Sequence, residues 1–378
     1  MEFGTLCVHG SRKRYDTAGA ISVPIFQSAT FVHPGVGQST GFDYSRVLNP
    51  TREYLEETMA RLESGTDALA FSSGMAAVAV LMELFRPGDH VIVSDDLYGG
   101  SVRYFKTVSE KNGLVFDSVD TGDIEAVRRR LRKETKAVFV ETPTNPLMQV
   151  TDIEALSRLL KGTGALLIVD NTFLTPRFQR PLELGADVVV HSGTKYLGGH
   201  NDTLAGFLVT NRPEVAERLR QLYKTIGACL SPFDSWLIVR GLKTLSVRVE
   251  RQAETAQALA LWLREHPKVT RVYYPGLPDH PGHEVMRRQA SGFGGIVSFR
   301  VDSEETAVKV LERVRLIQYA ESLGGTESLI TYPVLQTHAD LPEEVRRAKG
   351  IDGRLLRLSV GLESARDLME DLGQALEG

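Results

Sequence analysis

Lys195 lies in the stretch HSGTKYLGGH, residues 191–200, directly after the apolar run ADVVV. A lysine usually occupies a solvated helix face or a polar turn. This one instead follows a strand-like apolar segment and is surrounded by small polar residues and glycines. Lysine amines that are removed from water react with aldehydes to form Schiff bases. The position therefore predicts a lysine that is reserved for covalent chemistry.

Other polar residues also follow apolar segments. Asp170 ends ALLIVD, Asn145 follows KAVFVE, and Ser73, Gly74 and Met75 follow DALAF at the start of a helical pattern. A helix N-terminus preceded by Ser and Gly offers N–H donors to a phosphate, although Ser-Gly is also a common helix cap. An aspartate at the end of an apolar strand is costly unless it is paired, and a cap or an ion pair is the alternative explanation for Asp170.

These residues together match the needs of one cofactor. Pyridoxal phosphate (PLP) requires a lysine for its aldehyde, a carboxylate for its pyridinium nitrogen and an anion site for its phosphate. The sequence has no Walker A motif, no HExxH, no GxSxG and no GxGxxG that opens a helix after a strand. HPGH at 280–283 has two histidines without a nearby third ligand, so we expect a loop and no metal site there. PLP is therefore the predicted cofactor.

Two further residues fit a site of this kind. Tyr98, in DDLYGG, follows the apolar run HVIV, where its ring could stack on a flat cofactor, although a lone tyrosine is more often a packing residue. Arg357, in LLRLSVGLE, has a strand-like context. Its planar guanidinium could clamp an amino-acid carboxylate, and a partly buried ion pair is the alternative.

The elements that must position these residues alternate in a regular way. Apolar runs such as DALAF, HVIVS, LVFDSV, KAVFVE, ALLIVD and ADVVVH are separated by helical patterns. This rhythm predicts βαβ units and a mostly parallel sheet with helices on both faces. In such α/β folds ligands gather beyond the carboxyl ends of the strands, where the polar residues above occur.

The rhythm covers only part of the chain. Residues 1–50 are rich in Gly, Pro and aromatic residues without a period, which predicts an extended arm that leads into a helix at Thr51. Residues 51–245 form the predicted large domain, and residues 246–378 a smaller C-terminal α/β domain that opens with the long helical pattern RVERQAETAQALALWLREH. We therefore expect one large cofactor-binding domain with a smaller companion.

Composition narrows the class of protein. The chain has 378 residues, 44 Lys plus Arg against 48 Asp plus Glu, and a net charge of −4, with no basic cluster that would track nucleic acid. Cys7 and Cys229 form no CxxC, and no apolar run has the length of a signal peptide core or a membrane span. We expect a cytoplasmic protein with small-molecule substrates and neither nucleic acid nor membrane as partner.

Eight motifs occur in an order that resembles a known family. YSRVLNPT, FSSGMAA, DLYGG, ETPTNPL, VDNTF, HSGTKYLGGH, AESLGGTESLITYP and RLSVGLE are similar to the cysteine and methionine metabolism family of fold-type I PLP-dependent enzymes, from about residue 4 to 376. The family includes cystathionine γ-synthase, cystathionine γ- and β-lyases and methionine γ-lyase. The resemblance implies the fold of a fold-type I PLP-dependent transferase.

The resemblance also implies roles for individual residues. Lys195 would bind the cofactor covalently and shuttle protons, Asp170 would pair with the ring nitrogen, and Tyr98 would stack on the ring and assist at the leaving group. The phosphate site would comprise Ser73, Gly74, Met75, Ser192 and Thr194, with Tyr44 and Arg46 from a neighbouring subunit of a homotetramer. Asn145, Ser322 and Arg357 would bind the substrate's α-carboxylate or position the cofactor beside it, and Asn145 is expected to contact the cofactor as well.

The choice of reaction depends on three other positions. Glu321 matches an acid in cystathionine γ-synthases and γ-lyases, and Asp43 matches an acid in γ-synthases; either would hold a distal ammonium group, and a surface acid is the alternative for both. Gly100 departs from methionine γ-lyases, which usually carry cysteine there. The stretches STGFDY, TNPLMQ, PFDSWL and ITYPVLQTHADLPEE look most like bacterial γ-synthases that also act as O-acetylhomoserine thiolyases. This resemblance implies γ-replacement on an O-acyl-L-homoserine by cysteine or sulfide. Cystathionine γ-lyase or β-lyase is the runner-up, methionine γ-lyase is disfavoured, and a binding protein without turnover would have no use for Arg357.

Overall fold

The computed structural model describes residues 1–11, 13, 15, 18–339 and 343–377. Its main body holds a seven-stranded sheet in the order β1-β7-β6-β5-β4-β2-β3. The strands are β1 (Asp67–Phe71), β2 (His90–Ser94), β3 (Val115–Val119), β4 (Thr135–Glu141), β5 (Leu166–Asp170), β6 (Val188–Ser192) and β7 (Gly206–Thr210). Strands β2 to β6 pair in parallel, whereas β7 is antiparallel to both of its neighbours. The predicted α/β fold class is confirmed.

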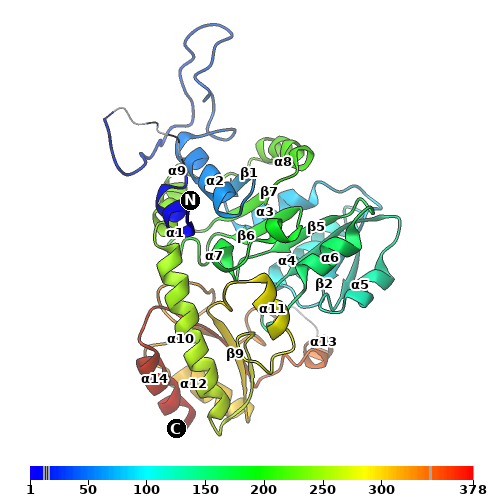
Figure 1. The fold of residues 1–378 in the computed structure, drawn as a ribbon, viewed down its shortest axis with the longest axis vertical. Coiled ribbons are helices and arrows are strands. Elements are labelled where there is room, and N and C mark those ends of the chain that lie inside the picture. Colours follow the sequence, from blue (N-terminus) through cyan, green and yellow to red (C-terminus); the bar gives the residue numbers. More distant parts are fainter. Residues whose placement is uncertain (12, 14, 16–17, 340–342, 378) are drawn as a thin grey trace.

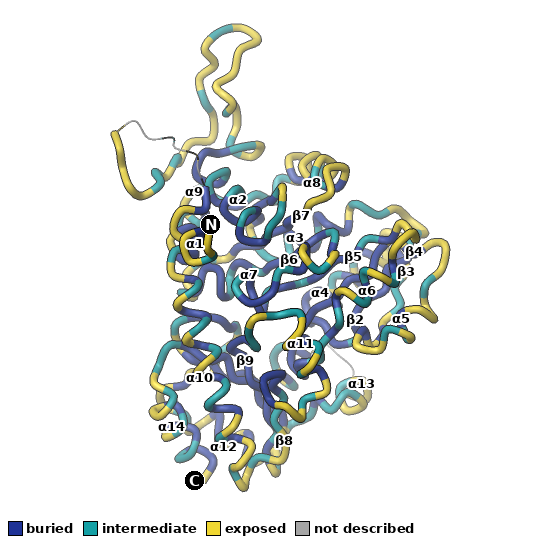
Figure 2. The backbone as a smooth tube through the Cα atoms, in the orientation of Figure 1, coloured by how far each residue is buried: buried dark blue, intermediate teal, exposed yellow. Residues whose placement is uncertain are grey.

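Helices cover both faces of this sheet (Figure 1). One face packs on α3 (Gly74–Met82) and α8 (Pro213–Ile226) through a cluster that includes Phe139, Ile168 and Val190. The opposite face packs on the following helices: α1 (Phe3–His9), α2 (Pro50–Leu62), α5 (Ile124–Arg130), α6 (Ile153–Leu160), α7 (Thr175–Phe178), α9 (Pro232–Leu242) and the 3₁₀ turn η2 (Pro181–Leu184). The central strands are buried along their length, as Figure 2 shows in dark blue. Their continuously apolar sequences are explained by this two-sided burial.

The helical segment after Tyr98 has an irregularity. Helix α4 (Gly99–Tyr104) continues directly into a π-helical turn, η1 (Phe105–Ser109). The stretch is therefore helical throughout but does not form one regular α-helix. Wide turns of this kind are frequently found near functional sites.

A second sheet lies in the C-terminal part of the chain, in the order β10-β11-β12-β9-β8. Its strands are β8 (Val269–Tyr273), β9 (Ile296–Val301), β10 (Gln318–Tyr319), β11 (Leu329–Thr331) and β12 (Leu355–Ser359). The helices here are α10 (Leu245–Glu265), α11 (His283–Gln289), α12 (Glu304–Arg313), α13 (Glu343–Ala348) and α14 (Ala365–Glu377). The smaller α/β unit is therefore as predicted, and the division of the chain near residue 245 stays our proposal.

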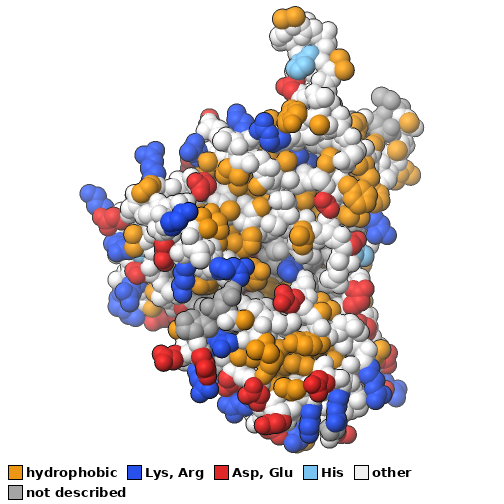
Figure 3. Space-filling view, turned by 180° about the vertical axis from the view of Figure 1, so that it is seen from behind, with side chains coloured by type: hydrophobic (Ala, Val, Ile, Leu, Met, Phe, Trp, Pro, Cys, Tyr) orange, Lys and Arg blue, Asp and Glu red, His pale blue; other side chains and the backbone are white. Residues whose placement is uncertain are grey.

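Part of the N-terminal segment, within residues 18–48, stands away from the body (Figures 1 and 3). The predicted arm over residues 1–50 is wrong for Phe3–His9, because these residues form α1 and bury Leu6 and Cys7 against the body. Residues 18–48 contain no regular helix or strand, only an isolated bridge between Thr30 and Tyr44. Ile21, Val32 and Val36 are exposed by 96%, 87% and 105%. Apolar side chains give up no hydrogen bonds to water when a partner covers them. A contiguous exposed apolar surface marks an interaction site.

Asn49 ends the arm and caps α2, because its side chain accepts hydrogen bonds from the backbone of Thr51 and Arg52. The predicted helix start at Thr51 is therefore right to within one residue. No helix in the described part of the chain combines the length and the apolar character that crossing a membrane requires.

The contact between β7 and the start of α3 leaves no room for a side chain at Gly206. A Cβ atom there would lie 2.1 Å from the carbonyl oxygen of Ser73 and 2.8 Å from the Cα atom of Gly74. Gly206→Ala should therefore displace the Ser73–Gly74 turn and lower the free energy of unfolding by about 1–3 kcal/mol, measured by urea denaturation. Gly4→Ala is the matched control, since no atom lies within 4 Å of its added Cβ. Equal unfolding midpoints for the two variants would contradict the packing described here.

Candidate active site

A cavity of about 240 Å³ lies at the carboxyl ends of the central strands, between the two sheets. It brings together most of the predicted site residues: Ser73, Gly74, Met75, Tyr98, Asn145, Asp170, Ser192, Thr194, Lys195, Glu321, Ser322 and Arg357. These residues come from both parts of the chain, since Glu321, Ser322 and Arg357 belong to the C-terminal part. Their placement follows from the rule that ligands bind beyond the carboxyl ends of parallel strands.

The start of α3 forms a cradle for an anion. Ser73 caps the helix, because its hydroxyl accepts the backbone N–H of Ala76 at 3.0 Å. Gly74 and Met75 follow in the first turn, where backbone N–H groups lack helical partners and the helix dipole is positive. A Cβ atom on Gly74 would lie 3.1 Å from Cβ of Ser192, so glycine keeps the cradle and β6 close together. This arrangement fits a phosphate group.

Asp170 faces the cavity from the end of β5. Its Oδ1 accepts the backbone N–H of Thr172 at 3.0 Å, and the Thr172 hydroxyl accepts the backbone N–H of Ser192 at 2.9 Å. Burial raises the pKa of Asp170, while the hydrogen bonds from Thr172 act in the opposite direction. No described cation forms an ion pair with Asp170. A carboxylate held in this way is suited to pair with a cationic ring nitrogen, which would supply the positive charge that Asp170 lacks as a partner.

Lys195 also reaches the cavity without a carboxylate partner. Its Nζ donates a hydrogen bond to the Ser322 hydroxyl at 2.8 Å. Burial, and then the nearby charge of Arg357, lower the pKa of Lys195 from the usual 10.5 to about 8, while Glu321 acts in the opposite direction. A sizeable fraction of this amine is therefore neutral and nucleophilic near physiological pH.

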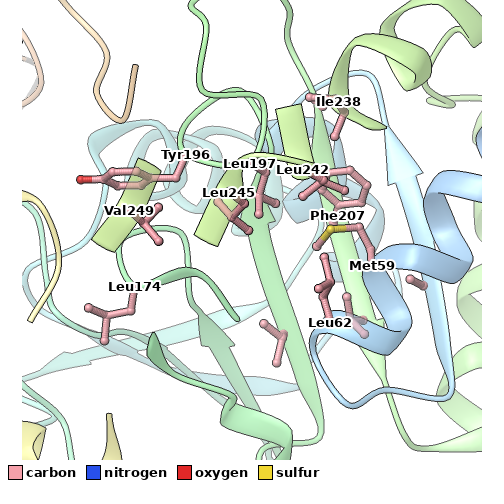
Figure 4. Close-up of a cluster of buried hydrophobic side chains, with 14 of the residues drawn as sticks. Met59, Leu62, Leu174, Tyr196, Leu197, Phe207, Ile238, Leu242, Leu245 and Val249 are labelled. Atoms are coloured by element: carbon pink, nitrogen blue, oxygen red, sulfur yellow. The ribbon is translucent and has the colours of Figure 1, made fainter. Parts of the chain in front are cut away.

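The backbone around Lys195 is fixed by its neighbours in sequence. Tyr196 and Leu197 are 1% exposed and pack in an apolar cluster with residues of α2, β7, α9 and α10 (Figure 4). The backbone N–H of Gly199 donates to the Lys195 carbonyl at 2.8 Å. The lysine therefore lies between an apolar core on one side and the cavity on the other, which determines the direction of its side chain.

Arg357 is a buried cation with an incomplete set of partners. It is 1% exposed, and its guanidinium donates to Asn145 Oδ1 at 2.8 Å, to the Ser322 carbonyl at 2.9 Å and to the Thr331 hydroxyl at 3.0 Å. Its Nε has no partner among the described residues. Burial lowers its pKa to about 10. A buried guanidinium that meets only neutral oxygens is suited to bind an incoming carboxylate.

Tyr98 is 44% exposed and lines the cavity, and its backbone N–H donates to Glu141 Oε2 at 2.9 Å. Gly100 leaves room for its ring, because a Cβ atom at residue 100 would lie 2.4 Å from Tyr98 Cε1. The ring therefore has room beside the cavity, and its predicted stacking on a cofactor stays a prediction.

Three predicted residues lie outside the cavity of their own chain. Asp43, Tyr44 and Arg46 lie on the arm, where the Ser39 hydroxyl donates to Asp43 at 2.6 Å and the Arg46 guanidinium lies 5.4 Å from the Tyr44 ring centroid. Arg46 also donates to the carbonyl of Lys224. Their predicted role requires a second subunit and stays a prediction.

Sequence reasoning missed Glu141, Thr172 and Thr337, which also line the cavity. Glu141 ends an apolar strand in the same way as Asp170, so the same signal could have found it. Thr172 and Thr337 belong to loops and carry no comparable signal.

The HPGH loop is held by local hydrogen bonds. His280 Nδ1 lies 3.0 Å from the backbone N of Gly282, and His283 Nδ1 lies 2.8 Å from the Pro275 carbonyl oxygen. Burial lowers the pKa of His280 to about 4. Within the described ranges, no group of three His, Cys, Asp or Glu side chains is arranged to hold a metal ion.

Comparison with known proteins confirms the predicted family. The model of the Cys/Met metabolism PLP-dependent enzyme family matches residues 4–377. The chain is 52% identical over 361 residues to a cystathionine gamma-synthase/O-acetylhomoserine (thiol)-lyase of Bacillus subtilis strain 168, covering 96% of this chain and 92% of that protein. It is 49% identical over 377 residues to a cystathionine gamma-lyase of the same organism, covering 100% of both chains.

The crystal structure of a cystathionine gamma-lyase from Lactobacillus plantarum complexed with L-serine superposes with a TM-score of 0.97. The two chains are 42% identical, and the match covers 100% of this chain and 99% of that one. The solved structure therefore agrees in fold, the family model gives the cofactor class, and the relatives differ in the named reaction.

The electrostatics of Lys195 can be tested without any substrate. We expect competitive labelling of the cofactor-free protein with a small amine-selective reagent, followed by mass spectrometry, to give half-maximal reactivity of Lys195 at about pH 8. Below this pH the amine is protonated and unreactive, and above it the reactivity reaches a plateau. Lys111, on the surface, serves as the internal reference. A Lys195 profile that coincides with that of Lys111 would contradict the effect of burial.

Proposed function

The chain belongs to the Cys/Met metabolism PLP-dependent enzymes, and within that family we propose that it catalyses γ-replacement on O-acyl-L-homoserine. The acyloxy group leaves Cγ as a carboxylic acid, and the thiol of L-cysteine takes its place, giving cystathionine. Sulfide in place of cysteine would give homocysteine. At a coarser level the chain is a PLP-dependent trans-sulfuration enzyme.

PLP, when bound, supplies an aldehyde that bonds to amines and a protonated ring that withdraws electrons from the neighbouring carbon. The Gly74 and Met75 amides, with Ser192 and Thr194, would hold its phosphate, and Asp170 would keep its ring nitrogen protonated. Tyr98 would cover the ring. Each of these residues faces the same cavity, which supports the assignment.

Arg357 would orient the substrate, and Lys195 would accept and donate the protons that the reaction transfers. Arg357 binds the α-carboxylate, and Asn145 holds the guanidinium in place through its Oδ1. The neutral Nζ of Lys195 removes the proton from Cα and then carries protons at Cβ, with the Ser322 hydroxyl as its resting partner. The Tyr98 hydroxyl would donate a proton to the leaving group.

Glu321 is the observation that favours trans-sulfuration, and with it γ-replacement by cysteine, over a reaction on methionine. It lines the cavity next to Ser322, at the exposed side, where it can hold the ammonium group of cysteine or of cystathionine. Gly100, with its missing side chain beside Tyr98, gives further support. The relative at 52% identity is named for this same reaction.

We also propose that the active form is a cytoplasmic homotetramer in which residues 1–50 complete the site of a neighbouring subunit. The exposed apolar side chains of the arm support this proposal, since a second copy would cover them. None of the described arm residues lines the cavity of its own chain, which supports the proposal as well. Asp43, Tyr44 and Arg46 would then be residues of the partner's site.

The proposed reaction predicts a specific product pattern. With O-acetyl- or O-succinyl-L-homoserine and L-cysteine, the enzyme should form cystathionine faster than it cleaves added cystathionine, measured by chromatography of the amino acids. Glu321→Ala should raise KM for cysteine roughly tenfold, because one ammonium contact is worth about 1–2 kcal/mol, and should change sulfide-dependent turnover less.

Cystathionine γ-lyase or β-lyase activity is the second candidate, because a γ-lyase aligns along the whole chain at 49% identity. Rapid cleavage of cystathionine, without its formation from the homoserine ester, would overturn the synthase proposal in favour of a lyase. The position of the released sulfur would separate γ-cleavage, which gives cysteine, from β-cleavage, which gives homocysteine.

The shared site predicts complementation between inactive subunits. Lys195→Ala removes the amine, and Arg46→Ala removes the arm's cation, so each homo-oligomer should be inactive or strongly impaired. Co-expression should place the intact arm of one variant against the intact Lys195 of the other and restore about a quarter of wild-type activity per site. Activity of the co-expressed pair no higher than the mean of the two single variants would contradict a site shared between subunits.

A further inference from the structure

Glu141 is a buried acid at the end of β4. None of the catalytic or binding roles assigned above involves this residue. It is paired in register with Asp170 on the neighbouring parallel strand β5. Residues paired in this way point to the same face of a sheet, and neighbouring strands are about 4.8 Å apart. Both side chains line the active-site cavity. Two carboxyl groups are therefore held side by side where the ring nitrogen would bind.

The contacts of Glu141 connect it to two other site residues. Its Oε2 accepts the backbone N–H of Tyr98 at 2.9 Å, and the backbone N–H of Asn145 interacts with the same carboxyl group. Tyr98 and Asn145 follow different strands, β2 and β4. Glu141 is only 6% exposed, and no described cation forms an ion pair with it. Its carboxyl group therefore contacts the backbones of two loops and has no cation beside it to favour ionisation.

The surroundings contain further charged groups that affect Glu141. Those that face it from neighbouring elements are Asp96 and Tyr98 before α4, Asp170 on β5, Lys195 after β6, Glu321 before β11 and Arg357 on β12. Asp96 accepts hydrogen bonds from the Thr144 hydroxyl and the Leu147 backbone, and burial raises its pKa to about 7. Its ionised form adds negative charge near Glu141. Burial, and then Asp170, raise the pKa of Glu141 well above its usual range.

We propose that Glu141 and Asp170 act as one proton-sharing pair that keeps a proton in the cofactor-free protein and releases it to solvent when the cationic ring binds. Two adjacent buried carboxyl groups cannot both be ionised at low cost, and their protons belong to the pair. A pyridinium beside Asp170 supplies the positive charge that makes double ionisation favourable. Glu141 then becomes a carboxylate that holds the backbones of Tyr98 and Asn145 more strongly. Glu141 is thus a positioning residue.

This inference depends on the cofactor that the family binds and not on the proposed γ-replacement. Its test requires neither a homoserine ester nor cystathionine, so its failure would leave the choice between synthase and lyase unaffected. Conversely, a lyase product pattern would not change the expected proton count.

The test is isothermal titration calorimetry of the cofactor-free enzyme with PLP at pH 7, in buffers of different ionisation enthalpy. The dependence of the observed enthalpy on the buffer gives the number of protons released. Wild-type enzyme should release about one proton per site more than Glu141→Gln, which keeps an acceptor for the Tyr98 N–H but cannot ionise. Equal proton counts for wild type and Glu141→Gln, to within about 0.2, would overturn the proposal.

Glu141→Asp separates the charge from the hydrogen bond. Its shorter side chain keeps an ionisable group next to Asp170 but cannot reach the Tyr98 backbone in the same way. We expect the wild-type proton count together with a weaker visible circular dichroism signal of the bound cofactor, because the Tyr98 ring is less firmly held. Loss of the proton release in Glu141→Asp would contradict a role for ionisation. Glu125→Gln, an exposed acid on α5, is the control for charge alone and should release the wild-type number.

Discussion

The rest of the structure depends on one electrostatic constraint. Ionisable side chains without ion-pair partners are enclosed at one edge of an apolar sheet. Lys195, Asp170, Glu141 and Arg357 surround a single cavity, and no ion pair joins any of them within the described ranges. Burying ionisable groups without partners costs free energy, which a folded protein must offset elsewhere. The close packing of the central strands provides that offset, since their side chains are almost wholly buried.

The unpaired charges also explain the chemistry. Burial gives Lys195 a pKa of about 8, so its amine is partly neutral, and it leaves Arg357 with neutral oxygens as partners until a carboxylate arrives. Asp170 and Glu141 are acids, and a bound cation would stabilise their ionised forms. A ligand that is anionic at its phosphate, cationic at its ring and joined to an amino acid through its aldehyde satisfies all of these groups together.

Much of this arrangement could be predicted from the sequence, because strands buried on both faces are continuously apolar and a polar residue at their ends is conspicuous. Lys195 and Asp170 were found in this way. The antiparallel strand β7 was not predicted, since GFLVT follows a glycine-rich loop and breaks the βαβ rhythm. Glu141 carried the same signal as Asp170, but its significance depends on the in-register pairing of β4 with β5, which the sequence does not display. The positions that select the reaction, Glu321 and Asp43, lie on a loop and on the arm, where periodicity gives no information.

The central claim is that Lys195 is the anchor of the cofactor, and reductive trapping tests it most directly. The enzyme would be loaded with PLP, treated with borohydride to fix the bond between amine and cofactor, digested and mapped by mass spectrometry. We expect one modified peptide at near-stoichiometric yield, with the added mass on Lys195. Added mass spread over surface lysines, or concentrated on another lysine, would contradict it.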